Sequence, residues 1–258
     1  MPKIAIVAAL EREVVGFTKS CRRVERAYEG RDFAFYEQND NVVVCGGIGP
    51  EAARRAAEAV IALYQPELLQ SVGFAGALNA ELRAGDLFTP SVVIDARDGS
   101  RIPVEGEPQT DQRSLVSFMA VAGAQQKASL AQAYGAQAVD MEAAAVAVAA
   151  RVHGIRFGTT KVISDELNFE MPGMDRFIDA QGRFETASFA GFVALRPWLW
   201  IRVAQLAINS RKAAKILAEH LLRFRQQLSQ APGRVPGTVP LSPQPTGVTN
   251  SSHAGGRK

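Results

Sequence analysis

Short apolar runs alternate with segments of helical periodicity along most of this chain, and this alternation limits the folds that it can adopt. Apolar runs of strand length occupy residues 3–9, 33–38, 41–46, 68–74, 87–94, 114–119 and 156–163. Helical patterns occupy residues 11–19, 50–64, 124–134, 141–153, 185–194 and 198–228. The alternation predicts a single α/β domain, in which helices flank both faces of a central mixed, mostly parallel sheet.

The charge of the chain is balanced outside its C-terminal segment. The net charge of +3 matches the three basic residues of 231–258, a segment without any acid. The remainder lacks the basic excess of a nucleic-acid-binding protein, so we expect no nucleic-acid partner. Residues 231–258 are rich in Pro, Gly, Ser and Thr and contain no aromatic residue. We therefore predict a catalytic domain over 1–230 and a disordered tail over 231–258.

Cysteine and histidine are too sparse for several kinds of site. The cysteines are Cys21 and Cys45, and the histidines are His153, His220 and His253, all far apart in sequence. This spacing argues against a disulfide framework, a metal site and a cysteine–histidine nucleophile. The apolar run at residues 4–10 is followed directly by charged residues, so it is typical of a first strand rather than a signal sequence. We expect a cytoplasmic protein.

Three acidic residues stand in or beside strongly apolar sequence. Asp140 and Glu142 interrupt a run of Ala, Val and Met, and buried carboxylates are costly unless something binds them. A sugar diol could be that partner. Asp165 follows the apolar run 157–163, which places it at the carboxyl end of a strand, where open α/β sheets bind ligands. We therefore expect carboxylates from both segments to face one crevice.

Three further motifs accompany these acids: Ile4–Val14, Gly46–Gly49 and Gly73–Leu78. In this order, and joined to Met141-Glu142 and Ser164-Asp165, they resemble the nucleoside phosphorylase and nucleosidase superfamily over about residues 3–225. The methylthioadenosine/S-adenosylhomocysteine nucleosidase branch is most similar. The resemblance implies cleavage of the N-glycosidic bond of an adenine-type purine nucleoside, without a metal or organic cofactor, by a homo-oligomer.

The resemblance also implies roles for individual residues. Asp165 corresponds to the catalytic acid that protonates the leaving base, with Ser164 as its hydrogen-bonding partner. Glu142 corresponds to the carboxylate that accepts the 2′ and 3′ hydroxyls of ribose, with Met141 packing against the sugar. Glu13 corresponds to the glutamate that activates the attacking water.

Each acid also has an ordinary structural interpretation. Asp165 could cap a helix that begins near Glu166, and Glu142 could occupy the favourable first turn of the helix that follows it. Glu13 could be a glutamate on a helix surface. Asp140 is interpreted as a cap or as a residue that supports the site from behind.

The chain departs from the family pattern at the nucleophile. Lys161 stands where the nucleosidase branch has an arginine, and we expect it to orient Glu13 or to bind phosphate. Phe74 stands where a small hydroxyl residue is usual, which weakens a phosphate site. We expect Phe74, Ala75 and Gly76 to contact substrate.

The glycine turn and the base platform leave alternatives open. The N–H groups of Gly47, Ile48 and Gly49 could bind an anion at a helix start, or the turn could simply need glycine conformations. The loop Val121–Gly123 has no aromatic residue to stack on the base. Phe169, Phe74 or Phe118 could serve instead, although each of them could equally be a core residue.

Other functions remain open from the sequence. Phosphate as co-substrate would make the chain a phosphorylase, and it also resembles the hopanoid-associated phosphorylases, which act on adenosylhopane. Basic and apolar residues interleave between Arg196 and Arg225, as in a helix that lies on an anionic membrane, although such a helix can also be the last helix of the fold. A non-catalytic nucleoside-binding module is a third interpretation, but it would not need Asp165 as a proton donor.

Overall fold

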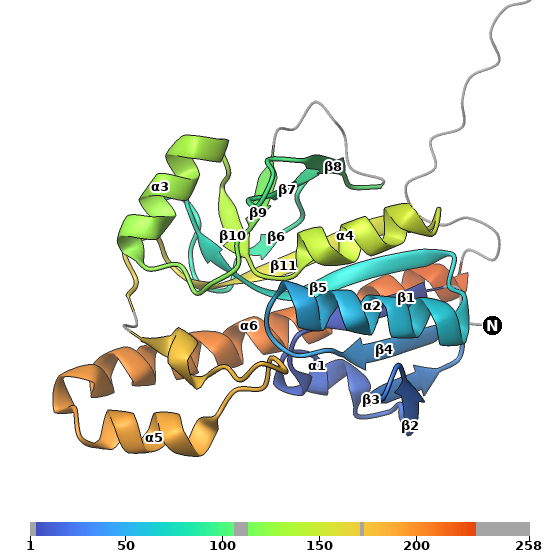
Figure 1. Ribbon diagram of the computed structural model, residues 1–258, viewed down its shortest axis with the longest axis horizontal. Helices are drawn as coiled ribbons and strands as arrows, with labels where there is room; N and C mark the ends of the chain where they lie inside the picture. The colour runs from blue at the N-terminus through green and yellow to red at the C-terminus, as the bar shows by residue number, and fades with distance from the viewer. Residues whose placement is uncertain (1–3, 106–112, 171–172, 231–258) are drawn as a thin grey trace, which may run out of the picture.

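The computed structural model describes residues 4–105, 113–170 and 173–230. One eleven-stranded sheet runs through this part of the chain (Figure 1). Its strands are β1 (Ile4–Ala8), β2 (Arg22–Tyr28), β3 (Arg31–Gln38), β4 (Asn41–Cys45), β5 (Leu68–Ala77), β6 (Leu87–Phe88), β7 (Val92–Asp95), β8 (Arg101–Pro103), β9 (Ser114–Ser117), β10 (Ala138–Asp140) and β11 (Arg156–Asp165).

The strand order is β2-β3-β4-β1-β5-β10-β9-β7-β8, and β11 pairs with β5 and β6. Strand β5 is central because it pairs in parallel with β1 and β11 and, at its last residues, in antiparallel fashion with β10. The sheet is mixed, as predicted. Parallel pairs form two groups, β4-β1-β5-β11 and β10-β9-β7, and antiparallel pairs join these groups and add the strands at the margins.

Helices cover both faces of the sheet. They are α1 (Glu11–Thr18), α2 (Pro50–Tyr64), α3 (Ala124–Tyr134), α4 (Ala143–Val152), α5 (Thr186–Ala194) and α6 (Pro197–Gln230), with one 3-10 turn at Met174–Phe177. Helices α2 and α4 lie side by side on one face, and α1 and α6 pack together on the other (Figure 1). Alanines dominate the buried sides of α2 and α4, which lets these helices lie close together.

The predicted elements agree with the structure wherever a long apolar pattern supported them. The helices at 50–64 and 124–134 have the predicted bounds. The predicted strand 87–94 is split into β6 and β7 by a segment containing Pro90, which has no N–H for a ladder. Strands β2, β8 and β10 were missed because β2 is mostly exposed and charged and the other two have three residues each.

The predicted tail at 231–258 lies outside the described residues. Within the described ranges, no helix is both long and apolar enough to cross a membrane.

Candidate active site

The register of three strands brings distant parts of the chain to one edge of the sheet. Asp165 at the end of β11 pairs with Gly76 near the end of β5, across a shift in the register. Val139 of β10 pairs with the same glycine from the other side. Because β1 runs parallel to β5, the helix that follows β1 also begins at this edge. The motifs that carry the resemblance therefore converge.

A cavity of about 160 Å³ lies at this convergence. Nine of the residues predicted for the site line it, and they are Glu13, Ile48, Phe74, Ala75, Gly76, Met141, Glu142, Ser164 and Asp165. The other lining residues are Ala9, Leu10, Arg12, Ala120, Val121, Ala122, Lys127, Val139 and Asp140. Phe169, Lys161, Gly47 and Gly49, which were also predicted, are not part of the lining. Among the described residues, no group of His, Cys, Asp and Glu is arranged to hold a metal ion.

Glu13 is buried in the first turn of α1 and points at the backbone of β5. Its Oε2 accepts a hydrogen bond of 3.2 Å from the N–H of Leu10, which closes the start of the helix. A Cβ at Gly73, whose φ is +147°, would lie 3.0 Å from that same oxygen. Glycine at position 73 therefore admits the carboxylate. Burial raises the pKa of Glu13 above its ordinary value of 4.5, which suits a general base better than a surface glutamate.

Glu142 immediately precedes α4 and is buried. Its Oε1 accepts a hydrogen bond of 2.8 Å from the N–H of Gly49, and its Oε2 lies 3.3 Å from the N of Met141. Burial first, and the charge of Asp140 second, raise the pKa of Glu142 to about 7. Each oxygen of this buried carboxylate can accept a further hydrogen bond, so hydroxyl donors from a ligand would stabilise its charged form.

Asp140 lines the cavity and also accepts a hydrogen bond at the start of α4, which agrees with its interpretation as a cap. Its carboxylate accepts hydrogen bonds from the hydroxyl of Ser117 at 2.5 Å and from the N–H of Ala143 at 2.8 Å, so it caps α4. The same carboxylate forms an ion pair of 2.8 Å with Lys161.

Lys161 is 1% exposed and has a different partner from the one expected. Its ammonium group pairs with Asp140 and donates to the hydroxyl of Ser71 at 3.1 Å. Burial opposes the charged form, but the carboxylates of Asp140 and Glu142 outweigh it and raise the pKa of Lys161. The sequence predicted that Lys161 orients Glu13 or binds phosphate. Its direct partners are Asp140 and Ser71, it does not line the cavity, and its charge opposes the rise that burial causes in the pKa of Glu13. A buried acid without a partner would be unfavourable, and the lysine therefore neutralises the nearest one.

Asp165 has two side-chain partners. Its Oδ1 lies 2.7 Å from the hydroxyl of Ser164, and its Oδ2 contacts the ammonium group of Lys127. A Cβ at Gly76 would lie 2.9 Å from that same Oδ2, so glycine is needed there for space. No helix begins at Glu166, and the interpretation of Asp165 as a helix cap is therefore wrong.

Lys127 is the main residue of the cavity that sequence reasoning missed. It lies on the buried side of α3 with Leu130, is 1% exposed, and also donates to the carbonyl of Glu166 at 2.7 Å. A lysine three positions before an apolar residue on the inner face of a helix was the available signal. The local pattern does not name its partner, because Asp165 lies 38 positions away.

The N–H groups of the glycine turn already have acceptors in the protein. Gly47 donates to the carbonyl of Ala9 at 2.9 Å and Ile48 to that of Gly182 at 2.7 Å, while Gly49 donates to Glu142. The anion that this turn meets is thus a side chain of the same protein. A phosphate would have to displace these acceptors, which counts against the expectation of an external anion here.

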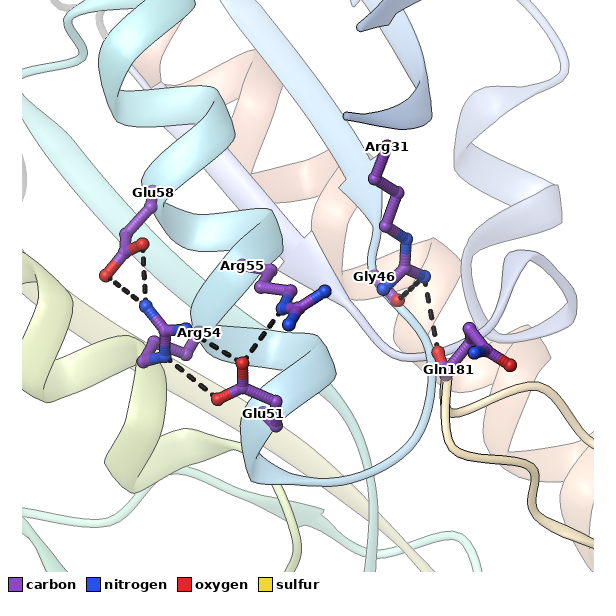
Figure 2. A network of polar contacts seen from close by, with 7 residues as sticks. All are labelled: Arg31, Gly46, Glu51, Arg54, Arg55, Glu58 and Gln181. Carbon is purple, nitrogen blue, oxygen red and sulfur yellow. Dashed lines mark hydrogen bonds and ion pairs between the residues drawn. The ribbon is translucent and has the colours of Figure 1, made fainter. Parts of the chain in front are cut away.

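Arg31 holds the turn from outside, and a salt-bridge network lies within the helix that follows the turn (Figure 2). Arg31 donates to the carbonyl of Gly46 at 2.7 Å and to that of Gln181 at 3.3 Å, and so joins the turn to the segment that crosses it. In the first turns of α2, Arg54 pairs with both Glu51 and Glu58. These pairs add modestly to the stability of α2, while Arg31 connects the turn to the segment beside it.

No aromatic residue of the described lining other than Phe74 faces the cavity. Phe169 is half-buried elsewhere, and Phe118 packs against a core cluster beneath α3. The loop Ala120–Ala122 contributes small apolar side chains, and Asp175 holds it by accepting a hydrogen bond of 2.7 Å from the N–H of Val121.

The fold is similar to solved nucleosidases at low sequence identity. A methylthioadenosine/S-adenosylhomocysteine nucleosidase from Helicobacter pylori, solved with butyl-thio-DADMe-Immucillin-A, is 19% identical with a TM-score of 0.61, covering 86% of this chain and 99% of that one. A futalosine hydrolase from the same organism is 18% identical with a TM-score of 0.60, covering 86% and 98%. The nucleosidase of Colwellia psychrerythraea, solved with adenine, is 19% identical with a TM-score of 0.56, covering 84% and 96%.

A comparison with curated proteins gave no match. The family model described as the phosphorylase superfamily matches residues 3–125 and 117–193, which is more than half of the chain. Together with the strand order and the converging motifs, this match confirms the resemblance seen in the sequence. The chain belongs to the phosphorylase superfamily.

Proposed function

We propose that this chain hydrolyses the N-glycosidic bond of an adenine-type purine nucleoside. The observation that carries the proposal is the meeting of Glu13, Glu142 and Asp165 in one cavity. They come from α1, from the residue before α4 and from the end of β11. Each has a different set of partners, so each can take a different role.

The reaction needs a group that binds the ribose, a general base and a general acid, and the three carboxylates can fill these roles. Glu142 accepts hydrogen bonds from the 2′ and 3′ hydroxyls while the sugar gains positive charge. Glu13 takes a proton from water as its oxygen bonds to C1′. The bond from C1′ to the base breaks, and Asp165 gives a proton to the base. Lys127 pairs with the carboxylate that this transfer leaves on Asp165. The cycle closes when Asp165 takes a proton from solvent and Glu13 releases one to it.

Charge in the cavity favours water over phosphate. Apart from Arg12 and Lys127, the described lining has no cationic side chain, and Lys127 already pairs with Asp165. Lys161 is buried against Asp140, and the glycine turn binds Glu142. Phosphate would therefore approach several carboxylates with few available donors, whereas water carries no such penalty.

Phosphorolysis of a nucleoside with a bulky apolar group, such as adenosylhopane, is the second candidate. One observation favours it: a groove of about 510 Å³ between α1 and α6 shares Arg12 and Phe74 with the carboxylate cavity. Val15, Ala214 and Leu222 give this groove apolar walls. An apolar group on the 5′ carbon could extend into it while the nucleoside occupies the cavity.

The deciding experiment incubates the full chain with adenosine, methylthioadenosine and adenosylhomocysteine, with and without phosphate. Free adenine together with a non-phosphorylated sugar, detected by mass spectrometry, supports hydrolysis. A sugar 1-phosphate as the only product would identify a phosphorylase. Nucleoside binding without any base release would identify a non-catalytic binding module.

The groove has its own test within this series. Adenosines with longer 5′-alkylthio chains should bind more tightly, and Ala214→Trp, which fills the groove, should remove that gain without affecting adenosine. Ala204→Trp, at an exposed position of the same helix, is the matched control. If both variants bind every 5′-alkylthio adenosine as tightly as the parent does, the groove does not bind the 5′ substituent.

A further inference from the structure

Helices α5 and the first part of α6 form a hairpin that projects from the body of the molecule (Figure 1). No residue of α5 is buried. The outward side of the hairpin exposes large apolar side chains: Leu195 is 79% exposed, Trp198 70%, Trp200 55%, Ile201 81% and Ile208 62%. We name these five residues the apolar tip. Several exposed large apolar side chains gathered on one element indicate a binding surface.

The inner side of the hairpin is already packed, so the apolar tip is not a loosely folded core. Phe177 contacts the rings of Phe189 and Phe192, and Leu199 is 4% exposed. The indole N–H of Trp200 donates to the carbonyl of Val193 at 3.0 Å. The hairpin is therefore held by its own contacts and presents the remaining apolar groups outward.

The second half of α6 has a different character. Ala213, Leu217 and Leu221 are buried in the core cluster that includes α1 and β11. The sequence suggested that the whole basic helix could lie on a membrane. The structure places this half as a core helix with a solvated basic face, so only the hairpin remains available for such a contact.

The charge of the hairpin region distinguishes between occupants. Residues 186–218 contain no Asp or Glu. Arg196 and Arg202 belong to the hairpin, and Arg211, Lys212 and Lys215 follow where α6 joins the core. Arg196 lies 3.8 Å from the ring centre of Phe192, and the side chain of Lys212 donates to the carbonyl of Ala84. Arg202, Arg211 and Lys215 are exposed. A second copy would bring like charges together, whereas an anionic surface would be attracted.

We propose that the apolar tip docks into the headgroup region of an anionic lipid bilayer. Tryptophan prefers the boundary between headgroups and acyl chains, and arginine and lysine pair with anionic headgroups beside it. The described helices cannot cross the bilayer, so the contact is peripheral. This proposal does not depend on which nucleoside the cavity binds.

The two tryptophans of the chain make a direct measurement simple, because Trp198 and Trp200 both belong to the apolar tip. The full chain is mixed with vesicles of phosphatidylglycerol and phosphatidylcholine, or of phosphatidylcholine alone. We expect the fluorescence to shift to the blue, and brominated lipids to quench it, with the anionic vesicles. Added salt should weaken binding to them. An unchanged spectrum with anionic vesicles would overturn the proposal.

A pair of variants distinguishes binding through the apolar tip from nonspecific hydrophobic binding. Leu195→Ser with Ile201→Ser should weaken vesicle binding at least about tenfold, because two large apolar side chains no longer enter the lipid. Val152→Ser removes an equally exposed apolar side chain, 73% exposed, at the end of α4 and should bind like the parent. Both variants should keep the parent's base release in the absence of lipid.

The competing occupant is tested in the same preparation by sedimentation. The proposal fails if the apolar tip is an interface between copies. In that case the parent chain self-associates, the double serine variant does not, Val152→Ser still does, and the parent does not bind vesicles. Equal vesicle binding by the parent and the double variant would also overturn it.

Discussion

The ammonium group of Lys127 contacts the carboxylate of Asp165 at the edge of the candidate cavity. Lys127 also donates to the carbonyl of Glu166, so one buried side chain holds both the acid and the turn that follows it. Ser164 contacts the other carboxylate oxygen of Asp165. Asp165 therefore has a fixed orientation before a nucleoside binds, which lowers the entropic cost of the reaction.

Asp165→Asn should reduce base release from adenine nucleosides by about 10²–10⁴-fold, because asparagine keeps the size but cannot transfer a proton. Substrate binding, measured by calorimetry, should persist. Glu166→Gln is the matched control, since that side chain is exposed and faces Arg83 at 3.5 Å. Rates within a factor of about three of the parent would remove Asp165 from general acid catalysis.

Lys127→Met should lower kcat by about 10–100-fold and leave KM nearly unchanged, because Asp165 loses the contact that positions it. Methionine fills most of the space, so the melting temperature reports whether the fold survives. Lys127→Arg keeps the charge and should recover part of the rate if positioning by a cation matters. A loss that appears in KM alone would contradict this role.

The KM of a ribonucleoside should rise as the pH falls through about 7. Burial raises the pKa of Glu142 to this value, and the protonated group accepts hydrogen bonds from the sugar less well. The matching 2′-deoxynucleoside should show a smaller rise. Glu142→Gln should make the KM of the ribonucleoside less dependent on pH. It should also raise that KM more than the KM of the 2′-deoxynucleoside. Equal pH profiles for both sugars would mean that Glu142 does not bind the 2′ hydroxyl.

Glu13→Gln should abolish base release in phosphate-free buffer, with a loss of about 10²–10⁴-fold. Glutamine can still accept the hydrogen bond from Leu10, so the fold should be kept. In the parent, activity should fall on the acid side at a pH above 4.5, because burial raises the pKa of Glu13 and only its ionised form accepts a proton. Undiminished release by the variant would exclude Glu13 as the base.

Much of the fold was predictable from the sequence because long apolar patterns report burial directly. The pattern at 50–64 gave a helix with correct bounds, and the runs around residues 68–74 and 156–163 gave the two central strands. The short strand β10 was not predictable, since three residues carry too little periodicity. The charged strand β2 is defined by its pairing with β3 rather than by burial.

The sequence by itself determined which chemistry the cavity could hold. Acids that interrupt apolar runs, as Asp140 and Glu142 do, require partners wherever they are buried. This requirement follows from residue type and local pattern. The roles expected of Glu13 and Asp165 came instead from the resemblance to the superfamily, and the space that Gly73 and Gly76 leave for carboxylates is visible only in the structure.

Only the tertiary structure decided which groups meet. Lys161 was expected to orient Glu13 or to bind phosphate, and its ion-pair partner is Asp140. The glycine turn binds Glu142 from 93 positions away, and Lys127 reaches Asp165. Such pairings depend on strand order and on the competition among buried charges for the nearest partner. Local periodicity predicts neither the strand order nor the choice of partner. A helix or strand pattern specifies which side is buried and not what that side packs against.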